Sequence, residues 1–144
     1  MKNISVKIYS FVAVLLMLGL IFSGCASLPV PTEAEVIDAI GVALLAYANG
    51  ALEALTGSAE GVEYNTTTLV VTFTGYDVSG YGEGQYSSIS GTVSNGMNGW
   101  TFDVTLTGTG AVETLSFITT SLDQATTITA VANGESFTVD VQDL

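Results

Sequence analysis

Basic side chains are almost absent from this chain of 144 residues, and their absence excludes several kinds of function. It has two Lys and Arg in total, 14 Asp and Glu, and no His. Both cations, Lys2 and Lys7, lie at the very start, so the sequence after Lys7 has no basic side chain. Binding to nucleic acid phosphates requires such side chains, as do His general bases, Schiff-base lysines and Ser-His-Asp triads. We therefore expect no nucleic acid partner and none of these catalytic mechanisms.

The acid–base groups that remain are carboxylates and tyrosines, which further limits the reactions that the chain could catalyse. The chain has enough acidic residues for a hydrolase that uses two carboxylates, but no pair of them has a spacing that argues for such an enzyme. Zinc sites use Cys and His ligands, and the chain has one Cys and no His. We expect no enzymatic activity, no catalytic residue and no resident cofactor.

Cysteine is scarce as well, and the single one, Cys25, excludes an intramolecular disulfide. The residues before it are ordered by type: Lys2 and Lys7 come first, the apolar stretch 8–22 follows, and the small residue Gly24 precedes the cysteine. A basic start, roughly 15 apolar residues and small residues at the end are typical of a secretory signal. A transmembrane helix is the competing interpretation, but it needs roughly 20 apolar residues.

The sequence Phe22-Ser23-Gly24-Cys25 resembles the lipobox of bacterial lipoproteins. This resemblance covers residues 1–25 only. It implies that the Cys25 thiol receives a diacylglycerol, that cleavage between Gly24 and Cys25 removes residues 1–24, and that the new N-terminus is acylated, for example with palmitate. The partner of the anchor is then a membrane of the cell envelope. By resemblance to lipoprotein sorting, Ala26 in place of an Asp favours the outer membrane over the inner one.

Residues 25–31 are predicted to hold the lipidated cysteine and a short tether, and a helix is predicted from about residue 32 to 56. Thr32 followed three residues later by Glu35 forms a capping-box pattern. The helix is apolar around most of its circumference, which is typical of a buried helix. Gly57 is the expected C-terminal stop.

From about residue 61 to 143 the apolar pattern changes to period two, which predicts strands. The clearest case is the stretch 100–107, where apolar and polar residues alternate strictly. Turn-forming pairs such as Asn95-Gly96 separate the strands, and short links leave only antiparallel neighbours. We predict one α+β domain over residues 32–144. Its N-terminal apolar helix would be packed on, or cradled by, a curled antiparallel β-meander of about six strands.

Four aromatic residues around one predicted loop are a candidate ligand platform: Tyr76, Tyr81, Tyr86 and Trp100. Aromatic rings gathered at one end of a sheet can stack on a sugar ring or on a hydrophobic ligand. The favoured interpretation is simpler, with the rings packing at the edge and core of the sheet and their polar ends reaching water.

Asp77 and Glu83, in the same segment, are a weak calcium candidate. Calcium takes about six to eight oxygen ligands. No D-x-[DN]-x-[DN]-G loop is present, and the two carboxylates fall well short of that number. Solubility is the favoured explanation of the excess of carboxylates, because a charged surface keeps copies of the protein apart.

These features predict a lipid-anchored envelope lipoprotein whose domain has a non-enzymatic structural or interaction role, with an envelope protein as its partner. The alternative is a ligand-binding module for a small apolar molecule or a sugar. A sizeable apolar cavity between helix and sheet would favour the ligand-binding module, and a filled core would favour the structural role.

The charge balance leads to a testable prediction about stability. After removal of residues 1–24 the side chains carry 14 carboxylates and no cation, so their mutual repulsion has no internal relief. Because salt screens like charges, added salt or millimolar calcium should raise the melting temperature of the mature domain. Thermal unfolding followed by circular dichroism over a salt series measures this, and a melting temperature independent of salt would contradict it.

Overall fold

The computed structural model describes residues 28–97, 99–119 and 127–144. In these residues the chain forms the helix α2 (Glu33–Thr56), seven strands and the short 3-10 helix η1 (Val141–Asp143). The strands are β1 (Val62–Asn65), β2 (Val70–Asp77), β3 (Tyr86–Gly96), β4 (Gly99–Gly108), β5 (Thr114–Thr119), β6 (Thr127–Ala132) and β7 (Glu135–Asp140).

Both ends of α2 are fixed by local interactions that the sequence predicts. The Thr32 N–H donates to Glu35 Oε2 at 2.7 Å, and the Glu35 N–H donates to Thr32 Oγ1 at 3.4 Å, so the capping box is formed. Hydrogen bonds from the Thr32 backbone N–H and from the Thr32 hydroxyl to the Glu35 carboxylate lower the pKa of Glu35. At the other end Gly57 takes a left-handed conformation with φ 70° and closes the last turn. The predicted helix is thus confirmed.

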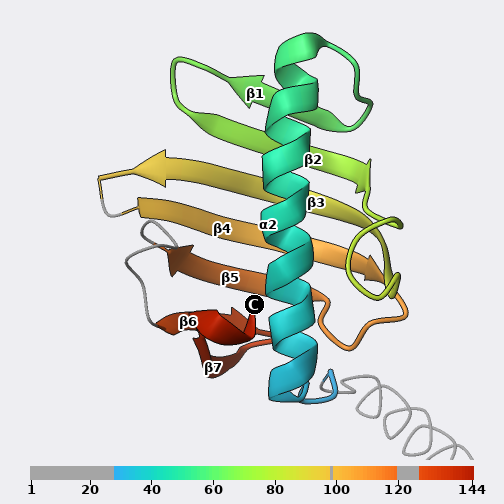
Figure 1. Cartoon of the computed structure of the whole chain (residues 1–144), viewed down its shortest axis with the longest axis vertical. Coiled ribbons are helices and arrows are strands. Elements are labelled where there is room, and N and C mark those ends of the chain that lie inside the picture. Colours follow the sequence, from blue (N-terminus) through green and yellow to red (C-terminus); the bar gives the residue numbers. More distant parts are fainter. Residues whose placement is uncertain (1–27, 98, 120–126) are drawn as a thin grey trace, which may run out of the picture.

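The strands form one open antiparallel sheet in the order β1-β2-β3-β4-β5-β6-β7, which is a meander (Figure 1). The predicted α+β fold with an antiparallel meander is confirmed, with seven strands where about six were expected. The additional strand is β1, which pairs with β2. Its four residues include only Val62 and Tyr64 as apolar members, so alternation could not identify it.

Helix α2 lies across one face of this sheet and supplies the other half of the core (Figure 1). Small helix residues, Ala39, Ala43 and Ala46, are completely buried, which lets the helix approach the strands closely. On the sheet, Phe102 of β4 and Phe117 of β5 stack with their centroids 4.3 Å apart. Among the described residues α2 is long and apolar enough to cross a membrane, but the core helix of a soluble protein passes the same test.

Two glycines of α2 illustrate how this packing depends on side-chain volume. A Cβ added at Gly50 would sit 2.8 Å from Cε1 of Phe73, a ring that is only 2% exposed. A Cβ added at Gly41 would meet no atom within 4 Å. Both sites are helical, so only the close approach to the sheet distinguishes them.

The same substitution at these two glycines should therefore have opposite effects. Gly41→Ala should raise the free energy of unfolding by about 0.5–1 kcal/mol, because alanine is the better helix former. Gly50→Ala should lower it by about 1–2 kcal/mol, because displacing a buried ring costs more than the helix propensity returns. Urea unfolding of both variants measures the two changes, and equal changes would show that Gly50 is not a packing site.

Candidate functional site

A chain of hydroxyl groups links the end of α2 to the loop between β2 and β3. The Tyr76 hydroxyl donates to Glu53 Oε2 at 3.0 Å, and it lies 3.1 Å from the Tyr81 hydroxyl. Since the single proton of Tyr76 is used for the carboxylate, Tyr81 must donate to Tyr76. The three groups therefore form one directed network from Tyr81 through Tyr76 to Glu53.

Burial of the Tyr76 ring, which is 5% exposed, raises the pKa of its hydroxyl well above the usual value for tyrosine. The bonds to Tyr81 and Glu53 raise this pKa further. The hydroxyl is therefore neutral at physiological pH and acts as a donor. A surface hollow of about 370 Å³ adjoins the network, with Glu60 and Asp77 among the residues around it. The network holds the β2–β3 loop against the helix.

Tyr86 and Trp100 do not join this network. Tyr86 is 2% exposed, and its hydroxyl accepts a hydrogen bond from the Val112 N–H at 3.4 Å. Trp100 pairs with Asn95 at the far end of β3 and packs edge-on against Tyr47, with ring centroids 4.9 Å apart. The four predicted platform residues are thus divided among three environments. The structure brings only Tyr76 and Tyr81 together, and Tyr86 is buried away from any surface ligand.

Two β-bulges explain why the tyrosines turn inward. In β2 the register shifts between Phe73 and Tyr76, and in β3 it shifts between Tyr86 and Ser88. Each irregularity reverses the alternation of faces, so Tyr76 and Tyr86 face the helix although a simple count from the neighbouring buried residues places them outside.

The calcium candidates Asp77 and Glu83 are each engaged by neutral donors. Asp77 Oδ1 accepts the Ser79 N–H at 2.9 Å, and hydrogen bonds from Ser79 lower the pKa of this carboxyl. Glu83 Oε2 accepts a bond from the Gln85 amide at 3.1 Å. In the described part of the chain, no three His, Cys, Asp or Glu side chains come together in a group that could hold a metal ion.

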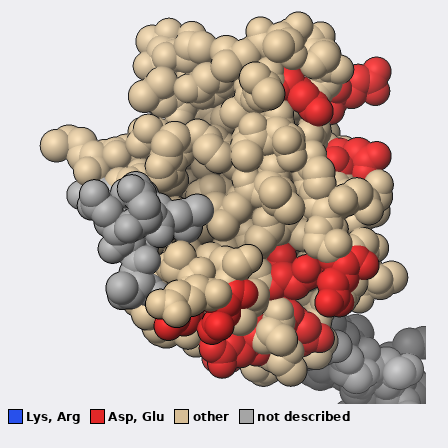
Figure 2. All heavy atoms as spheres, viewed as in Figure 1, with Lys and Arg blue, Asp and Glu red and all other residues tan. Residues whose placement is uncertain are grey.

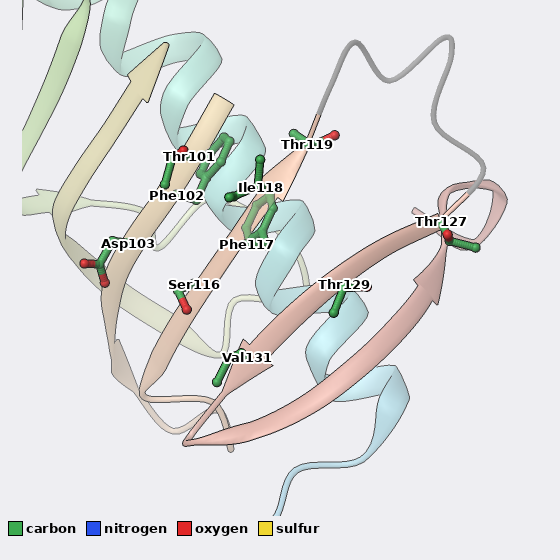
Figure 3. Close-up of a pocket in the computed structure, with 10 residues that line it drawn as sticks. All are labelled: Thr101, Phe102, Asp103, Ser116, Phe117, Ile118, Thr119, Thr127, Thr129 and Val131. Atoms are coloured by element: carbon green, nitrogen blue, oxygen red, sulfur yellow. The ribbon is translucent and has the colours of Figure 1, made fainter. Parts of the chain in front are cut away.

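The outer face of the sheet, opposite α2, carries an array of hydroxyl groups and one shallow hollow. Cross-strand pairing places Thr92, Asp103, Ser116 and Val131 in one row across β3, β4, β5 and β6. A hollow of about 710 Å³ opens over this region. Figure 3 shows its outer residues on β4–β6, while the rings of Phe102 and Phe117 lie on the helix side.

The hollow exists because β5 and β6 separate. They pair over only three residues of each strand, Leu115–Phe117 with Ala130–Ala132, and then diverge toward Thr119 and Thr127 (Figure 3). Exposed Ile118 and Val131 add apolar surface to the threonine and serine hydroxyls that line the hollow. Such a surface can donate and accept hydrogen bonds.

Sequence reasoning missed two parts of these sites. Glu53 lies 23 residues before its partner Tyr76, so no local pattern connects them. The divergence of β5 and β6 depends on how far their register continues, which alternation within one strand does not reveal. The predicted lipid attachment residue Cys25 and the cleavage residue Gly24 lie outside the described residues.

Comparison with protein-family models, with curated proteins and with solved structures gives no match to this chain.

The Tyr76–Glu53 contact leads to a pH-dependent prediction. Tyr76→Phe should lower the free energy of unfolding by about 1–2 kcal/mol at neutral pH, because it removes a hydrogen bond to a charged group. The folded pKa of Tyr76 is raised, so the stability linked to its neutral form is present below the unfolded pKa of about 10 and is lost as pH rises further. The deficit of the variant should therefore shrink in alkaline solution.

Urea unfolding of both proteins at neutral pH and at about one pH unit above the unfolded tyrosine pKa measures this change. Tyr81→Phe is the matched control, because it keeps the bond between Tyr76 and Glu53 and should retain most of the neutral-pH stability. A deficit for Tyr76→Phe that is the same at both pH values would show that the hydroxyl does not titrate as argued.

Proposed function

We propose that this protein is a lipid-anchored lipoprotein of the cell envelope, with a folded domain that has a structural or interaction role and no enzymatic activity. The observation that carries the proposal is the sequence Phe22-Ser23-Gly24-Cys25 after a basic and then apolar start. The lipid would be attached to Cys25 as a diacylglycerol with an additional acyl chain on the N-terminus. The outer membrane is the favoured location because Ala26 follows the cysteine.

The organisation of the core supports removal of residues 1–24. Among the residues that the structure describes, the buried hydrophobic ones lie between Val36 and Val139. The helix cap at Thr32 is completed by Glu35, on its C-terminal side, and needs no residue before Thr32. The described contacts between helix and sheet are thus made by residues that cleavage before Cys25 would retain.

The interface between α2 and the sheet supports a structural or interaction role over a ligand held inside the fold. Its buried residues form one continuous apolar cluster that includes Ile40, Val42, Phe73 and Phe102. The hollow of about 710 Å³ described above lies on the opposite face of the sheet. The carboxylates of Glu53, Asp77 and Glu83 accept hydrogen bonds from Tyr76, Ser79 and Gln85, respectively.

The anchor is tested by replacing the cysteine. Cys25→Ser should prevent lipid attachment and the associated cleavage, so the intact mass of the variant should include residues 1–24 and lack the diacylglycerol and the additional acyl chain. Wild-type protein should begin at Cys25 and partition almost entirely into the detergent phase of a Triton X-114 extraction. The two acyl chains of a diacylglycerol are sufficient for such stable anchoring.

A Phe22→Leu variant is the control for this experiment, because it alters the same motif while leaving the thiol in place. It should be processed and acylated as the wild type is. A wild-type protein whose mass includes residues 1–24 and no lipid would overturn the proposal in favour of a membrane-spanning N-terminal segment.

A further inference from the structure

The outward face of α2 carries an apolar stripe that the fold leaves uncovered. We define this α2 stripe as Gly41, Leu45, Ala48, Leu52 and Leu55, which are spaced by four and three residues in turn and so share one side of the helix. Its leucines are exposed by 45%, 62% and 60% along the chain. Apolar residues aligned in this way on a helix surface indicate a docking face.

The α2 stripe is also free of charge. Between Asp38 and Glu53 the helix has no charged residue. Figure 2 shows the carboxylates along one margin of the molecule and at its lower end, with none over the middle of α2. A surface that excludes carboxylates in so acidic a chain is suited to a partner that disfavours charge, such as the acyl region of a membrane.

The position of the anchor brings that partner within reach. The described chain begins at Leu28. Only residues 25–27, Cys25 included, lie between the anchor and the described structure. At about 3.3–3.6 Å per residue they span at most roughly 11 Å. Leu28 and Val30, at 38% and 68% exposure, add apolar surface between the anchor and the helix. A lipid on Cys25 therefore holds the N-terminal end of α2 close to the bilayer.

We propose that the α2 stripe lies against the membrane leaflet that holds the lipid of Cys25, so that the helix rests parallel to the bilayer surface. This inference depends on the anchoring proposed above. Three partly exposed leucines are a weak membrane ligand alone, but an anchor makes their contact intramolecular and raises its effective concentration. The stripe would thus orient the domain, while the lipid retains it.

The charge of the protein determines which lipids favour this contact. Interfacial helices commonly use Lys and Arg to bind anionic headgroups, and this chain has neither after Lys7. Glu33 and Glu35, in the first turn of α2 and near the anchor, repel anionic headgroups instead. Contact is therefore stronger on zwitterionic than on anionic vesicles, and salt strengthens it on anionic vesicles by screening the repulsion.

A single-cysteine labelling experiment tests the orientation. The acylated protein with Leu52→Cys, reconstituted in phosphatidylcholine vesicles, is labelled with an environment-sensitive fluorophore, since lipid attachment at Cys25 blocks the only native cysteine. Thr92→Cys, on the exposed outer face of β3, is the matched control. The label at position 52 should emit at shorter wavelength and be quenched severalfold more by lipids with brominated acyl chains.

Further arms of the experiment separate the outcomes. Adding phosphatidylglycerol should reduce quenching at position 52, and salt should restore it; the opposite salt dependence overturns the proposed charge argument and with it the inference. Leu45→Glu should reduce quenching at position 52, and because Leu45 is exposed this change does not disturb the core. Excimer formation between pyrene labels at position 52 would identify a second copy of the chain as the occupant and overturn the inference.

The intact mass of the same sample distinguishes failure of the anchor from failure of the orientation. A mass without lipid overturns both proposals. A lipid on Cys25 together with equal quenching at positions 52 and 92 overturns only the contact of the α2 stripe with the membrane.

Discussion

The packing of α2 across one face of the meander is the interaction on which the rest of the structure depends. An antiparallel sheet with one apolar face is not stable alone in water, and neither is a helix as apolar as α2. Each covers the other, with fully buried Ala39, Ala43 and Ala46 bringing the helix close to the strands. The sheet covers only one side of the helix, however. The opposite side, which carries Leu45 and Leu52, therefore stays exposed. The uncovered side is therefore a consequence of pairing one helix with one sheet.

A chain without cations after Lys7 must satisfy its carboxylates with neutral donors, and the structure does so repeatedly. Glu35 accepts a backbone N–H at the start of α2, and Asp77 and Asp140 each accept the N–H two residues further along. Glu53 accepts a tyrosine hydroxyl. Hydrogen bonds to charged acceptors are stronger than those between neutral groups, so these contacts fix helix and turn ends without ion pairs. They leave the net charge unchanged, and repulsion between the remaining carboxylates persists.

Much of the fold could be predicted from the sequence because its signals are local. The capping box at Thr32 and the glycine at position 57 define α2, and alternation defines the longer strands. The candidate site was predicted less well because it depends on interruptions of that alternation. Bulges in β2 and β3 turn Tyr76 and Tyr86 toward the helix. The apolar pattern within each strand does not predict these bulges. The Tyr76 and Tyr81 hydroxyls meet because Tyr81 lies in the loop that follows β2, whereas Trp100 pairs with Asn95 at the other end of β3.

The two faces of the sheet differ in a way that suits an anchored protein. If α2 rests on the bilayer, the face of the sheet opposite the helix points away from it (Figure 1). That face bears the hydroxyl row through Thr92 and Ser116, with Asp103 as the charged residue between them. Threonine and serine on strands give the surface hydrated hydroxyl groups without adding charge. They therefore do not increase the repulsion among the carboxylates. A partner on that side would then meet a sheet surface of hydroxyl and carboxylate groups, with a hollow where β5 and β6 separate.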